Sequence, residues 1–142
     1  MTSDKSRLRR ARLIERLRSA EQRQAAVEAH RAEAVRQKLE QLSDRTRTLA
    51  QVYALRDTSR DGADLRSASL LGNHLHDLGT TAARQAEQAR READDRLADL
   101  AAADRRLQKA EEGRRDLARA IHEKADKAEP AAAARKTGTH LE

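Results

Sequence analysis

The sequence predicts an all-α protein in which two long helices form an antiparallel coiled-coil hairpin. Apolar residues recur every three or four positions in two long stretches, and a short polar segment, residues 57–62, separates them. A short connection makes neighbouring helices antiparallel. Helix formers such as Ala, Arg, Glu, Leu and Gln dominate, whereas only 1% of residues are aromatic. Strands are therefore not expected.

We expect one hairpin domain over residues 1–130. Its parts are a first helix over about residues 4–56, a turn over about 57–64 and a second helix over about 65–129. The tail, residues 131–142, follows the only proline and is predicted to be disordered.

The periodic residues define the expected contact line of each helix. In the first helix they are Leu13, Leu17, Ala20, Gln24, Val27, Arg31, Val35, Leu39, Leu42, Thr46, Leu49 and Tyr53. In the second they are Leu71, Leu75, Leu78, Ala82, Ala86, Ala89, Ala93, Leu97, Leu100, Ala103, Leu107, Ala110, Arg114, Leu117 and Ile121. Both runs have a mean spacing of about 3.6 residues, which predicts weak supercoiling.

Composition limits the alternatives. Charged residues make up 38% of the chain, which is typical of long helices but also of disorder. Sustained helical periodicity favours the helices. There is no cysteine, so neither a disulfide framework nor a thiolate metal site is expected. No apolar run is long enough for a signal peptide or a membrane span, which predicts a cytoplasmic protein.

Positive charge is concentrated at the N-terminus. Residues 1–24 hold eight Lys or Arg against three Asp or Glu, which gives +5 of the chain's net +6. Such a helix can bind an acidic protein surface, phosphates or an anionic membrane, or it can simply be a solvated face. We do not expect nucleic acid as a partner, because aromatic stacking residues and a basic-region zipper are missing.

Nothing in the sequence predicts catalysis, a metal site, a cofactor or a small-molecule substrate. The five histidines do not converge: His74 and His76 are two residues apart, which places them on different sides of a helix. No nucleophile, phosphate-loop or zinc-protease motif is present. The chain is therefore interpreted as a binding protein and not an enzyme.

Tyr53 is the only aromatic residue and lies near the predicted turn. It either closes the hairpin against Leu71 or Leu75, or serves as an anchor for a partner. The second helix begins with more leucine than a two-helix contact needs, which favours a contact surface there.

The layout resembles the FliJ/YscO family of type III protein export, over roughly residues 5–135. The resemblance is carried by a first helix that ends at Tyr53, a polar break with Gly62, a leucine-containing return segment over residues 65–78, and a long charged second arm. The segments Arg105-Arg106-Leu107 and Arg114-Arg115-Asp116-Leu117 are also similar to the way such chains finish. The chain departs from the family in having one aromatic residue where relatives often have several.

The resemblance implies a cytoplasmic stalk at the base of the flagellar export apparatus, part of the machinery of type III secretion and motility. Such a stalk binds the export ATPase hexamer, promotes its assembly and activity, contacts the cytoplasmic domain of the export gate and escorts export chaperones. It is thereby associated with the membrane only indirectly. The implied ATPase-binding residues are Arg9, Arg12, Arg16, Arg115 and Arg119. The implied export-gate-binding residues are Leu42, Leu49, Tyr53, His74 and Leu78.

Three other interpretations stay open. The chain can be a generic coiled-coil scaffold or adaptor, or a basic helix associated with nucleic acid, whose binding would fall steeply with salt. The arms can also open and pair between chains, which would give a dimeric coiled coil.

Overall fold

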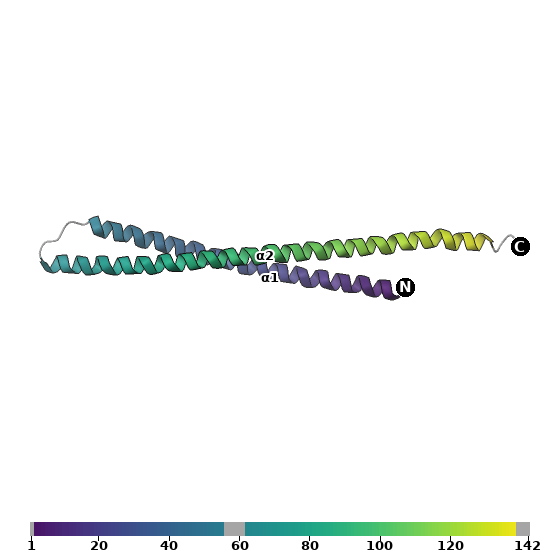
Figure 1. The fold of residues 1–142 in the computed structure, drawn as a ribbon, viewed down its shortest axis with the longest axis horizontal. Coiled ribbons are helices and arrows are strands. Elements are labelled where there is room, and N and C mark those ends of the chain that lie inside the picture. The colour runs from purple at the N-terminus through teal and green to yellow at the C-terminus, as the bar shows by residue number, and fades with distance from the viewer. Residues whose placement is uncertain (1, 56–61, 139–142) are drawn as a thin grey trace. The chain divides into compact units, whose positions relative to one another are not determined.

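The computed structural model describes residues 2–55 and 62–138, and it describes side chains over 3–53 and 62–129. Both described segments are helical: α1 spans Thr2–Leu55 and α2 spans Gly62–Gly138 (Figure 1). The two helices pack against each other, which confirms the predicted all-α antiparallel hairpin.

The chain divides into two units, and each helix passes through both. Unit 1 consists of Met1–Gln24 and Ala101–Glu142, and unit 2 is Ala25–Leu100. The sequence predicted a single hairpin domain, whereas the structure divides the chain into these two compact units.

The helices are antiparallel within each unit. In unit 1, Asp4 lies 3.5 Å from Lys124, and Glu15 forms an ion pair with Arg114. In unit 2, Glu28 lies 3.3 Å from Arg96. A Cβ built on Gly79 would lie 3.7 Å from the Thr46 side chain. Residue numbers thus rise along α1 as those of their partners fall along α2.

Burial along α1 recurs at alternating steps of three and four residues, which is a seven-residue repeat. Fifteen buried or half-buried positions follow this repeat. They are Asp4, Leu8, Ala11, Glu15, Arg18, Gln22, Ala25, Ala29, Ala32, Arg36, Leu39, Ser43, Thr46, Ala50 and Tyr53. We call this row the α1 seam; it consists mainly of small and polar residues.

The same repeat runs along α2. Its buried or half-buried positions are Gly72, Leu75, Gly79, Ala82, Ala86, Ala89, Ala93, Arg96, Leu100, Ala103, Leu107, Ala110, Arg114, Leu117 and Ile121, here called the α2 seam. The most buried of them is Ala93, of which 1% is exposed. Twelve of these fifteen residues were predicted from the sequence; Leu71, Leu78 and Leu97 were each one residue away from the position that is buried.

The predicted contact line of α1 is largely wrong. Only Leu39, Thr46 and Tyr53 of that line lie in the α1 seam. Its larger aliphatic residues are about half exposed instead: Leu13, Leu17, Val27, Val35, Leu42 and Leu49. From Leu13 to Arg31 each residue of the predicted line comes two residues after a residue of the α1 seam, and Leu42 and Leu49 each lie one residue away from it. Residues two apart occupy different sides of a helix, so most of the predicted line faces away from the contact. Small residues at the 3.5 spacing therefore make the contact.

Polar residues in the seams are satisfied. Thr46 is buried, and its hydroxyl donates a hydrogen bond to the Leu42 carbonyl at 2.7 Å. The charged seam residues all have ion-pair partners: Asp4, Glu15, Arg18, Arg36, Arg96 and Arg114. Among the described residues, no buried side-chain nitrogen or oxygen lacks a hydrogen-bond partner. Such pairing offsets the desolvation of polar groups in a contact this narrow.

The helix ends differ modestly from the predicted bounds. α1 begins at Thr2 and α2 at Gly62, each a few residues earlier than expected. α2 continues to Gly138, into the segment predicted as a disordered tail. Residues 131–136 are four alanines, an arginine and a lysine, which are among the strongest helix formers. Most of the predicted turn, residues 57–61, lies outside the described residues, as do residues 139–142.

We predict that Gly113→Ala raises the free energy of unfolding by about 0.5–1 kcal/mol, because glycine weakens a helix interior. A Cβ at Gly113 would meet no atom within 4 Å, so the alanine fits without a clash. Gly79→Ala should also stabilise, since its methyl group would lie in ordinary contact with Thr46. Thermal unfolding followed by circular dichroism measures both, and a lower midpoint for both variants would contradict these helix assignments.

Candidate interaction surfaces

Unit 1 carries a row of exposed cations on α1. The row consists of Lys5, Arg9, Arg12 and Arg16, and we call it the basic ridge. Steps of four, three and four residues place them on one side of the helix. Together with Leu8 and Leu13 they line a shallow surface groove. The described residues contain no ion pair or hydrogen bond for these four side chains, so their charges are available to a partner.

The basic ridge continues onto α2 through a seam residue. Arg12 and Arg16 line a second groove together with Ser19 and the paired residues Glu15 and Arg114. Resemblance had implied Arg115 and Arg119 as the α2 contribution. Both are exposed in the same unit, and Arg115 lies 4.0 Å from Glu111. Arg114 is the α2 cation that shares a groove with Arg12 and Arg16.

Net charge differs between the units. Unit 1 contains eighteen Lys or Arg against eleven Asp or Glu, a net charge of +7, whereas unit 2 contains twelve against thirteen, a net charge of −1. An acidic partner is therefore attracted to unit 1 and not to unit 2.

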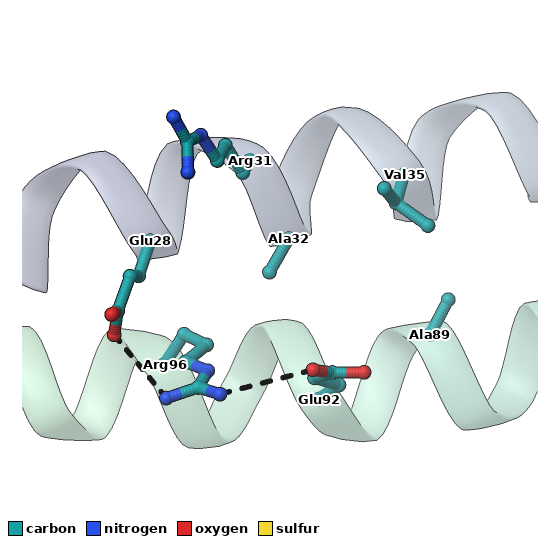
Figure 2. A pocket seen from close by; sticks show the side chains of 7 residues that line it. All are labelled: Glu28, Arg31, Ala32, Val35, Ala89, Glu92 and Arg96. Atoms are coloured by element: carbon teal, nitrogen blue, oxygen red, sulfur yellow. Dashed lines mark hydrogen bonds and ion pairs between the residues drawn. The ribbon is translucent and has the colours of Figure 1, made fainter.

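Unit 2 has a groove along one side of the helix pair, shown in Figure 2. Ala32 and Val35 of α1 point toward α2, and Ala89 of α2 points back toward them. At one end of the groove Arg96 bridges Glu28 and Glu92, with distances of 3.3 and 4.0 Å. Arg31 belongs to the rim, and its side chain is turned away from α2.

Half-exposed aliphatic residues extend this side of unit 2. Leu42 and Leu49 follow Val35 at intervals of seven residues, so they occupy the same side of α1. On α2, Leu78 and Leu71 precede the groove residue Glu92 by fourteen and twenty-one residues, so they occupy the same side of α2. With Val52, one turn beyond Leu49, these residues form what we call the apolar face. Its members are between 41% and 52% exposed: Val35, Leu42, Leu49, Val52, Leu71 and Leu78.

The structure brings together three of the five residues that were implied for the export gate. Leu42, Leu49 and Leu78 belong to the apolar face. Tyr53 lies in the α1 seam and is half-buried. Its position agrees with a role in closing the hairpin. His74 is exposed on α2, one turn beyond Leu71 and at the edge of the apolar face.

Sequence reasoning missed a charged cluster around Arg36 in the α1 seam. The Arg36 Nε donates to Glu33 at 2.8 Å, and its Nη1 donates to both Glu40 oxygens at 2.9 Å. The hydrogen bond from Arg36 lowers the pKa of Glu33 below its ordinary value, and the bonds to Glu33 and Glu40 raise the pKa of Arg36. The spacing of Glu33, Arg36 and Glu40 by three and four residues was the available signal.

Within residues 2–55 and 62–138, neither helix has a stretch that is both long and apolar enough to cross a membrane. The same part of the chain contains no group of three His, Cys, Asp or Glu side chains placed to hold a metal ion.

Comparison with known protein families, with curated proteins and with solved structures gives no match.

We predict that the Glu33 carboxyl titrates below the ordinary glutamate pKa in the folded protein and that Arg36→Gln raises this pKa toward the ordinary value. A lowered folded-state pKa stabilises the fold fully above the unfolded-state pKa, and the contribution is lost as pH falls through the folded value. Carbon-detected NMR titration of the Glu33 carboxyl measures the shift. Arg45→Gln, an exposed change on the same helix, should leave it unaltered, and an ordinary Glu33 pKa in the parent protein would refute the cluster.

Proposed function

We propose that this chain is a coiled-coil stalk of a flagellar-type protein export apparatus, which binds the export ATPase ring through unit 1 and promotes its assembly and ATP hydrolysis. The observation that carries the proposal is the exposed basic ridge of unit 1, for which the described part of the chain contains no ion pair. A helix pair of this kind fits the pore of a ring whose lining is acidic, and opposite charge speeds its insertion.

Two further features support the ATPase contact. The excess positive charge is confined to unit 1, so electrostatic attraction orients that unit toward the ring. The Glu15–Arg114 ion pair joins α1 and α2 directly beside Arg12 and Arg16. It holds the ridge against its partner helix.

The proposal assigns the apolar face of unit 2 to the cytoplasmic domain of the export gate. Leu42, Leu49 and Leu78 are each about half exposed, and exposed aliphatic groups on one side of a helix pair are typical anchors for a partner. In this role the protein is cytoplasmic, reaches the membrane only through the gate and escorts export chaperones.

We predict that charge reversal of the ridge by Arg9→Glu, Arg12→Glu and Arg16→Glu lowers ATPase stimulation at least about tenfold. Helicity by circular dichroism should stay unchanged, because all three side chains are exposed and the described residues contain no ion pair or hydrogen bond for them. The measurement is the hydrolysis rate of the export ATPase from the same cell, with and without this protein, at several salt concentrations.

The matched control reverses three exposed arginines of unit 2, Arg66, Arg84 and Arg90, and so changes the total charge equally. It should retain stimulation. If parent protein neither stimulates the ATPase nor elutes with it, the stalk proposal fails, and a coiled-coil adaptor becomes the better account.

We predict that Tyr53→Ala spares ATPase binding and weakens gate binding. Since Tyr53 lies in the α1 seam, the exposed change Leu78→Gln separates a surface effect from a structural one and should weaken gate binding as well. Pull-down with the isolated gate domain and with the ATPase measures the two contacts. Loss of ATPase binding with intact gate binding would mean that the two surfaces are assigned the wrong way round.

A further inference from the structure

The apolar face of unit 2 leaves six aliphatic side chains about half exposed, while the seams beneath it contain mostly alanine and glycine. On α1, Val35, Leu42 and Leu49 repeat every seven positions, and on α2 Leu71 and Leu78 do so as well. A surface with this repeat on two parallel rows fits another pair of helices with the same repeat. A second copy of this chain presents such a pair.

The charged residues at the edges of the apolar face determine which arrangement of two copies is favourable. The outer edge of the face on α1 consists of Arg31, Lys38 and Arg45, which are one row of the seven-residue repeat. Figure 2 shows Arg31 on this outer side of α1. The corresponding outer row on α2 consists of His74, Thr81, Gln88 and Asp95, so its one carboxylate is that of Asp95. The described residues contain no ion pair for Arg31, Lys38, Arg45 or Asp95.

Two symmetric arrangements are available. A two-fold axis across the helices sets α1 against α1, so that the row of Arg31, Lys38 and Arg45 faces its own copy and like charges repel. A two-fold axis along the helices sets α1 of one copy against α2 of the other. Each α1 residue then faces the α2 residues that are level with it in its own hairpin.

The contacts within unit 2 identify the level residues. Glu28 is level with Arg96, and Thr46 is level with Gly79. Arg31 therefore lies within one helical turn of the level of Asp95. By the same count Leu49 lies within one turn of the level of Leu78. Aliphatic residues therefore meet at the centre of the contact, and one pair of opposite charges, Arg31 and Asp95, meets at each edge.

We propose that unit 2 forms a homodimer through the apolar face, with the two-fold axis along the helices. Leu42 and Leu49 of one copy pack around Leu78 of the other, and Arg31 of each copy pairs with Asp95 of the other. Both hairpins stay closed in this dimer. The inference does not depend on the proposed ATPase contact, because it uses no residue of unit 1, although it uses the same apolar face as the proposed gate contact.

The first test measures mass by sedimentation equilibrium over a wide range of concentration. The parent chain should pass from monomer to dimer. Leu42→Gln with Leu49→Gln should abolish the dimer without loss of helicity. The matched control is Leu97→Gln, which is equally exposed at 50%. Leu97 lies seven residues from Arg90, which lines a groove on the opposite side of the helix pair, so it should leave the dimer intact.

The second test uses complementary charge reversals. Arg31→Asp alone places two carboxylates in each edge pair, and Asp95→Arg alone places two guanidinium groups there, so each variant should dimerise about tenfold more weakly than the parent. An equimolar mixture of the two variants should recover dimerisation, because the mixed dimer restores both opposite-charge pairs. Recovery requires α1 to face α2 and would not occur with the axis across the helices.

A chain that stays monomeric at every concentration overturns the proposal and leaves the apolar face to a different protein. Equal loss of dimer in Leu97→Gln, or a mixture no stronger than the single variants, overturns the assigned face or axis. ATPase stimulation by the Leu42 and Leu49 double variant is measured in parallel. Because the ATPase contact is assigned to unit 1, this measurement tests the stalk proposal independently of dimerisation.

Discussion

The close approach of two helix backbones is the constraint on which the rest of this structure depends. Gly79 and the alanines that follow it along the α2 seam present almost no side chain toward α1, which lets the two backbones approach closely. At this separation the α1 residues opposite them have to be small or flexible. A contact that repeats every 3.5 residues admits one row of each helix. Larger aliphatic residues outside that row remain at the surface, and they form the apolar face.

The two helices, their antiparallel order and most of the α2 seam could be predicted from the sequence, because most leucine and isoleucine residues of α2 from Leu75 to Ile121 lie in the row that is buried. α1 has two competing rows. Hydrophobicity favours the row with Leu42 and Leu49, whereas the fit to the alanines of α2 favours the row with Ala29 and Ala32. Burial of the row with Ala29 and Ala32 depends on the partner helix, so it cannot be deduced from the sequence of α1 alone.

The candidate surfaces also differ in how far they could be predicted from the sequence. The basic ridge was visible as a local excess of arginine, since charge at the surface does not depend on which row is buried. The position of Arg114 beside Arg12 and Arg16 required the register between the helices. The grouping of Leu42 and Leu49 with Leu78 required it as well. The proposed gate contact and the proposed homodimer both use this apolar face, so a chain paired with its own copy would be unable to bind the gate.

Tyr53 is half-buried at the last position of the α1 seam, and the chain contains no tryptophan or phenylalanine. Near-ultraviolet absorbance and intrinsic fluorescence therefore both originate from a single side chain at one known place between the helices. A change in tyrosine emission reports separation of α1 from α2 at that place, without an introduced label. The same property makes the protein weakly visible at the wavelength that is commonly used to follow chromatography, so its elution is better followed by peptide-bond absorbance.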